Sequence, residues 1–137
     1  MKLSFFVTGN PKGQPRARRG RGRHVYDPGT ADDWRQRVQE HLMVAWDGMP
    51  FVGPVGVWLE FHFKRPRSHY RKSGLKPTAP HRWCESGYDR DNLDKAVLDA
   101  LTEAHLWRDD KSVCDGGVKK VWAESPGCHI TVKALEE

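Results

Sequence analysis

The sequence predicts one small domain of the α/β (mixed α+β) class, with a mixed sheet and two main helices. Four short segments are rich in the apolar and β-branched residues typical of strands, at 3–8, 55–63, 117–123 and 128–134. Two longer segments, 31–46 and 92–105, repeat apolar residues at helical spacing. The chain has 137 residues, which suits one domain with one hydrophobic core, so we expect all of 1–137 to fold together.

The first half of the chain begins with a predicted strand, 3–8, which ends at the turn sequence GNP at 9–11. Residues 10–28 are rich in Arg, Gly and Pro and have no apolar period, which predicts a loop. The first helix, over 31–46, follows the entry sequence DPGT and stops at DGMP. Its predicted apolar stripe consists of Trp34, Val38, Leu42 and Ala45.

The second strand, 55–63, is followed by a long segment without periodicity. Its alternation puts five apolar residues on one face: Val55, Val57, Leu59, Phe61 and Phe63. Residues 64–87 are basic and contain three prolines, which predicts a long loop. A loop of this length inside a small domain is usually functional or disordered.

The second helix, over 92–105, has the clearest pattern, and Asp91 is its predicted N-cap. Its apolar stripe consists of Leu93, Ala96, Val97, Ala100, Leu101 and Ala104. The last two strands, 117–123 and 128–134, flank the turn sequence SPG at 125–127. We therefore expect these strands to pair as a closing hairpin.

The net charge of +5 is unevenly distributed along the chain. Segments 11–24 and 64–76 each hold six Lys or Arg and no acid, whereas the rest of the chain has 11 basic residues against 18 acidic ones. Two basic segments on an acidic body predict a polyanionic partner, although a solubilising or localisation role is the alternative. The predicted contacts are Lys12, Arg16, Arg18, Arg19, Arg21, Arg23, Lys64, Arg65, Arg67, Arg71 and Lys72. Tyr70 is a candidate to stack on an unpaired base.

Two pairs of acids bracket the second helix, Asp89 with Asp91 before it and Asp109 with Asp110 after it. Carboxylates that converge repel one another, and a divalent cation relieves the repulsion. Oxygen ligands with water favour Mg²⁺, or Mn²⁺ in its place, together with a phosphate. The pairs form one site only if the chain folds back after the helix, because about 14 helical residues span ~20 Å. The alternative is ordinary capping and surface charge.

Lys95 lies four residues after Asp91 and four before Asp99, so a helix places the three along one edge. A lysine beside a metal could neutralise charge that develops on a phosphate. The alternative is an exposed ladder of ion pairs.

Taken together, D-x-DNL-x-K at 89–95, DAL at 99–101 and W-x-DD-x-x-V at 107–113 resemble RusA-type Holliday-junction resolvases (crossover junction endodeoxyribonucleases). The N-terminal strand, G-x-P at 9–11 and the Arg-rich loop are also similar to that family. The resemblance implies a RusA-like mixed α/β fold and a homodimer. It also implies a Mg²⁺-dependent enzyme that resolves four-way DNA junctions by paired symmetric nicks, in recombination and repair.

By the same resemblance, Asp89, Asp91 and Asp110 are the catalytic, metal-binding acids and Lys95 is a catalytic lysine. Asp109 has a supporting role, and Asn92 and Asp99 are structural. A partly apolar second face of the helix, with Leu98, Thr102 and His105, is a candidate dimer surface. The segment 66–87 is longer than the matching segment of compact relatives. This difference leaves three substrate classes open: a junction, a flap or other branched DNA.

Other classes of protein fit the sequence less well. Three cysteines without a regular spacing argue against a disulfide framework, so we expect a cytoplasmic protein in a reducing compartment. No run approaches ~20 apolar residues, so we expect no membrane span. Cys84 and Cys128, each near a histidine, fit no standard zinc spacing. The main alternative is a non-catalytic module that binds branched DNA. A Mg²⁺-dependent nucleotide hydrolase is weaker, since a Gly-rich phosphate loop is missing.

Overall fold

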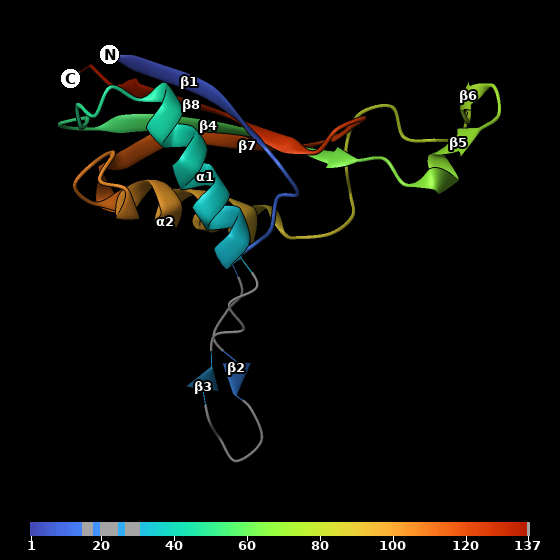
Figure 1. Ribbon diagram of the computed structural model, residues 1–137, viewed down its shortest axis with the longest axis horizontal. Helices are drawn as coiled ribbons and strands as arrows, with labels where there is room; N and C mark the ends of the chain where they lie inside the picture. The colour runs from blue at the N-terminus through green and yellow to red at the C-terminus, as the bar shows by residue number, and fades with distance from the viewer. Residues whose placement is uncertain (15–17, 20–24, 27–30, 137) are drawn as a thin grey trace.

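The computed structural model describes residues 1–14, 18–19, 25–26 and 31–136 (Figure 1). A four-stranded sheet is formed by β1 (Lys2–Thr8), β4 (Val55–Lys64), β7 (Val113–Ala123) and β8 (Gly127–Ala134). The strand order is β1-β8-β4-β7. β4 pairs in parallel with β7 and antiparallel with β8, and β1 pairs antiparallel with β8. The predicted mixed sheet is confirmed.

Helices α1 (Asp32–Ala45) and α2 (Arg90–Glu103) lie on one face of this sheet (Figure 1). Alternate residues of each inner strand point toward the helices, so Val57, Leu59 and Phe61 are buried while Trp58 and Glu60 are half-buried. From the helices, Trp34, Val38 and Leu42 of α1 pack into the same core with Leu93, Val97 and Leu101 of α2. The predicted stripes therefore face the core, except that Ala45 is exposed.

The predicted closing hairpin is wrong. β7 and β8 do not pair, because β4 lies between them. The turn at 125–127 suits a chain that crosses over one strand as well as a chain that pairs directly, so local sequence does not decide between the two. β7 also begins four residues earlier than expected, at Val113, and its first half is an exposed sheet edge around Gly116 and Gly117.

Helix α2 starts earlier than predicted. It begins at Arg90 with Asp89 at the N-cap position, so Asp91 lies within the first turn rather than at the cap. The side chain of Asp89 makes no capping hydrogen bond. Asp89 is thus extended, with φ −64° and ψ 146°, and Asp91 is helical.

At its other end, α2 stops in a sharp reversal of the chain. His105 takes a positive φ of 64°, the amide of Leu106 donates to the carbonyl of Leu101 at 3.2 Å, and that of His105 donates to Thr102 at 3.0 Å. This is the Schellman pattern of helix termination. Leu106 and Trp107 are buried immediately after it, and the Trp107 indole N–H donates to the Thr102 hydroxyl at 2.8 Å. The chain therefore turns back along the helix it has just left.

Both predicted basic loops contain short regular elements. The N-terminal one carries the two-stranded ribbon β2 (Arg18–Arg19) with β3 (Val25–Tyr26). The second carries the 3-10 helix η1 (Arg67–His69) and the ribbon β5 (Tyr70–Arg71) with β6 (Gly74–Leu75). In Figure 1 both ribbons extend away from the sheet and helices. Strands of two residues are too short to leave a periodic pattern in the sequence.

Among the described residues, no helix is long and apolar enough to cross a membrane.

Candidate active site

Lys120 of β7 binds the segment that leads into α2. Lys120 of β7 donates from Nζ to the carbonyls of Ser86 at 3.1 Å and of Tyr88 at 2.7 Å. Two residues earlier, the amide of Cys84 donates to the carbonyl of Lys120 at 3.0 Å. The backbone just before Asp89 is therefore held against β7, although the Asp89 side chain itself is exposed.

The first turn of α2 also holds the start of the N-terminal basic segment. The amide of Gln14 donates to the carbonyl of Asn92 at 2.8 Å. Gly13 fits beside Tyr88 so closely that an added Cβ would lie 2.9 Å from the Tyr88 ring. The first basic segment therefore starts beside Asp89 and Asp91.

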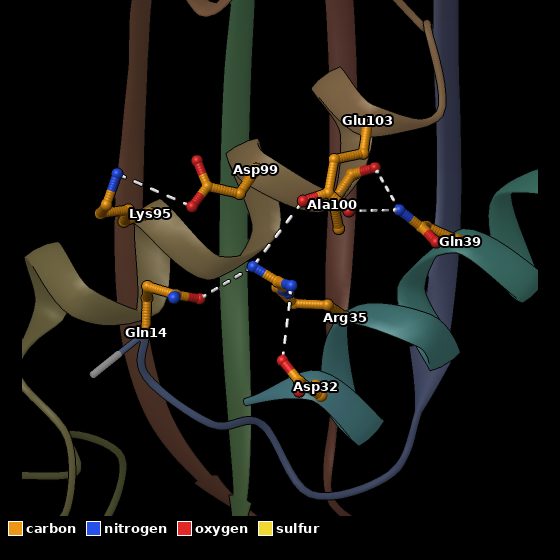
Figure 2. Close-up of polar contacts among 8 residues, drawn as sticks. All are labelled: Gln14, Asp32, Arg35, Gln39, Lys95, Asp99, Ala100 and Glu103. Atoms are coloured by element: carbon orange, nitrogen blue, oxygen red, sulfur yellow. Dashed lines mark hydrogen bonds and ion pairs between the residues drawn. The ribbon is translucent and has the colours of Figure 1, made fainter. Parts of the chain in front are cut away.

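Helix α1 supports this junction from the other side (Figure 2). Arg35 donates to the Gln14 side chain at 3.3 Å and forms ion pairs with Asp32 at 3.4 Å and Glu103 at 3.8 Å. Gln39 donates to the carbonyl of Ala100 at 3.0 Å. Figure 2 shows these contacts connecting Gln14, α1 and α2, so the basic segment and the helix with the acids are positioned together.

One exposed edge of α2 carries Asp91, Lys95 and Asp99, about 6 Å apart along the axis. Lys95 pairs with Asp99 at 3.7 Å, as the surface-ladder interpretation predicts (Figure 2). The Lys95 side chain is 62% exposed, so solvent screens this pair and it adds little stability.

The reversal after α2 brings Asp110 back to this edge. Asp110 begins the short 3-10 helix η2 (Asp110–Ser112), and Asp109 caps it by accepting from the Lys111 amide at 2.9 Å. The pKa of Asp110 lies above its usual range, first because of its hydrogen bond with Asp109, and further because the charges of Asp109 and Asp99 are near; Lys95 acts in the opposite direction. The chain therefore folds back along α2 as far as Lys95 and Asp99, whereas a single site requires a return to the start of the helix.

The pKa of Asp109 is shifted the other way, below its usual range, chiefly because the Lys111 amide donates to its charged form. The two neighbouring carboxylates thus share one hydrogen bond, and Asp109 is the one that holds its charge more readily.

The structure brings Asp110 to Lys95 and Asp99, whereas Asp89 and Asp91 lie at the start of the same helix. Among the described residues, no group of three or more His, Cys, Asp or Glu side chains is arranged to hold a metal ion. The donor chemistry nevertheless fits a hard divalent cation, because Asp89, Asp91 and Asp110 offer exposed carboxylate oxygens.

The family model described as endodeoxyribonuclease RusA matches residues 8–133, which is nearly the whole chain. The chain belongs to the RusA family. A search of the curated proteins found no match. The family is one of endodeoxyribonucleases that resolve Holliday junctions, which supports nuclease activity on branched DNA and confirms the resemblance inferred from 88–113.

The basic residues predicted to contact a polyanion differ in their surroundings. Lys12 is half-buried, while Lys64, Arg67, Arg71 and Lys72 are exposed to solvent. Arg18 and Arg19 form β2. Arg16, Arg21 and Arg23 lie outside the described residues.

Arg65 is engaged within its own loop, although it too was predicted to contact DNA. Its guanidinium donates to the carbonyls of Pro80 at 2.6 Å and His81 at 2.7 Å. These bonds close the base of the loop that carries β5 and β6, so Arg65 determines where the other basic residues of the loop extend.

Sequence reasoning missed the role of Lys120. In β7, Lys120 lies on the helix-side face with Val118 and Trp122. A charged residue at an inward-facing position of a strand indicates a specific polar partner, and this signal was present in the sequence. Two residues of the candidate dimer face also make contacts within the chain. Leu98 packs against the core and Thr102 accepts the Trp107 hydrogen bond, so both are used within the chain.

Proposed function

We propose that this protein is a Mg²⁺-dependent endodeoxyribonuclease that resolves Holliday junctions by paired symmetric nicks in DNA recombination and repair. Membership of the RusA family supports the reaction class. The observation that carries the proposal is the reversal at His105, after which Asp110 lies near Lys95 and Asp99 of α2.

In this proposal Asp89, Asp91 and Asp110 hold the divalent cation, Mg²⁺ or Mn²⁺. When bound, the cation supplies activation of water and stabilisation of the leaving oxygen in phosphodiester cleavage. The Lys120 bonds hold the backbone before Asp89, and the Schellman turn holds the start of the segment that carries Asp110. All three carboxylates are exposed to solvent.

Lys95 neutralises the charge that develops on the scissile phosphate. Its pair with Asp99 is long, at 3.7 Å, and exposed, so a phosphate competes for it at a cost below about 1 kcal/mol. The part of this interaction that strengthens as charge develops in the transition state is the part that speeds cleavage.

The two basic segments hold the DNA backbone on either side of the acids. Phosphate contacts of this kind position a duplex without reading its sequence. We also propose a homodimer, because paired nicks need two active sites and a four-way junction has near two-fold symmetry.

A labelled four-way junction tests this function. With Mg²⁺ at low salt, the protein should make two nicks at symmetric positions, and Asp91→Asn should lose cleavage while it keeps binding. The Lys95–Asp99 pair favours one other function, a non-catalytic binding module whose acids are surface charge. That alternative predicts binding indifferent to Mg²⁺ and no cleavage by the wild-type protein on any branched substrate.

A further inference from the structure

A cavity of about 530 Å³ lies beside the segment that leads to the acids, and it belongs to none of the roles above. The loop residues Arg82, Trp83, Glu85 and Ser86 line one side of it, and Trp122 of β7 lines the other. We propose that this cavity, referred to below as the tryptophan pocket, binds one unpaired base of the DNA strand next to the cleavage site. The proposal rests on the proposed function and names a subsite for it.

Trp83 is the stacking surface of the tryptophan pocket. The residue is 56% exposed, which is unusual for tryptophan in a chain that buries Trp34 and Trp107. Its backbone is nonetheless fixed, because Trp83 pairs with Val121 of β7 and the amide of Trp122 donates to the carbonyl of Arg82 at 2.7 Å. The indole therefore projects from a fixed point of the backbone, with the Arg82 guanidinium against its ring.

The charges at the tryptophan pocket favour a base over a phosphate. The Arg82 guanidinium lies 4.7 Å from the centre of the Trp83 ring and pairs with Glu60 at 3.8 Å, so its charge is already partly neutralised. Glu85 adds a carboxylate that repels phosphate and accepts hydrogen bonds from base edges. Aromatic rings with a stacked arginine are the usual platform for single-stranded nucleic acid.

The tryptophan pocket is mechanically coupled to the acids. Lys120 binds the carbonyl of Ser86, which lines the pocket, and that of Tyr88, which precedes Asp89. Ser86 and Asp89 are three residues apart, so their Cα atoms lie within about 11 Å. This upper limit corresponds to about three stacked nucleotides of one strand. A base in the pocket therefore fixes the register of the strand that reaches the acids.

An unpaired base is the species that enters, because a base inside a duplex must first leave its stack at a cost of a few kcal/mol. Branch points lower this cost, since strands exchange partners there. The tryptophan pocket thus favours binding of branched over linear DNA. Backbone contacts from the basic segments do not supply this selectivity.

Binding of the full chain to DNA without divalent cation tests the pocket, with Trp83→Ala compared with Trp83→Phe. Removal of a stacking partner costs about 1–3 kcal/mol per base, so Trp83→Ala should bind a four-way junction about 5- to 140-fold more weakly. Trp83→Phe should stay within about threefold, and linear duplex binding should not change. Equal thermal midpoints of the three proteins by circular dichroism would exclude a folding defect.

A series of junctions with one abasic nucleotide near the branch point locates the bound base. At one position the missing base should weaken the wild-type protein and leave Trp83→Ala unaffected, because the contact is already lost. The proposal is overturned if Trp83→Ala binds the junction like the wild type, if it loses as much affinity for linear duplex, or if no position shows this coupling. Failure of the wild type to cleave with Mg²⁺ would instead refute the proposed function.

Discussion

Replacement of Lys120 by methionine should slow DNA cleavage without a matching loss of DNA binding. Methionine keeps the apolar length of the side chain but removes the two hydrogen bonds to Ser86 and Tyr88, at 3.1 and 2.7 Å. A hydrogen bond to a charged group contributes about 1.5–3 kcal/mol when sheltered, and Lys120 is half-buried, so we take about 2 kcal/mol for the pair. If that energy holds Asp89 in place, the competent arrangement becomes about 30-fold rarer.

Single-turnover cleavage of a labelled junction with saturating enzyme and Mg²⁺ measures this effect. The rate should fall about 10- to 30-fold, and the junction dissociation constant should change less than about threefold. Lys119→Met is the matched control, because Lys119 is the exposed neighbour on the opposite face of β7 and loses the same charge. Equal cleavage rates of the two variants would refute a positioning role for Lys120, and a parallel loss of binding would identify Lys120 as a DNA contact instead.

Two further predictions concern stability. Thr102→Val leaves the Trp107 indole N–H buried and unpaired, so the free energy of unfolding in urea should fall by about 2 kcal/mol. Thr102→Ser keeps the hydroxyl and should have nearly the wild-type free energy of unfolding. Equal losses in the two variants would show that the 2.8 Å hydrogen bond does not support the reversal. The pKa of Glu60 is lowered, chiefly by its hydrogen bond from His62. The ionised Glu60 therefore contributes fully to the free energy of unfolding above the unfolded pKa of about 4.5. This contribution is lost as pH falls through the lower pKa of the folded state. The stability difference between wild type and Glu60→Gln should therefore shrink as pH is lowered below about 4.5, and a difference that grows in acid would contradict this assignment.

The positions of the main strands and of both helices could be predicted from sequence because each has a local cause. Val57, Leu59 and Phe61 alternate along β4, and Leu93, Val97 and Leu101 repeat along α2, so each face is visible in the sequence. Pairing partners have no such local signature. The insertion of β4 between β7 and β8 depends on the whole sheet, which is why the closing hairpin was predicted wrongly.

The candidate site was predictable in its residue types and only partly in its arrangement. The acids and Lys95 were visible as a motif. The single site required a reversal of the chain after the second helix, and the sequence did not predict that reversal. The reversal depends on a positive φ at His105. Glycine is the usual residue at such a position and would have predicted the turn, whereas histidine does not. The tryptophan pocket was also hidden, since it joins residues 80–86 with Trp122, which are distant in sequence.

The central claim is that Asp110, returned by the reversal after α2, acts with Asp91 in one active site. The most direct test compares Asp110→Asn with Asp99→Asn, since both carboxylates lie at the same helix edge and each loses one charge. On a labelled four-way junction with Mg²⁺, Asp110→Asn should lose cleavage by at least about a hundredfold while it keeps junction binding, and Asp99→Asn should cleave within a few-fold of wild type. If Asp110→Asn makes the symmetric nicks at the wild-type rate, the account of the site is contradicted.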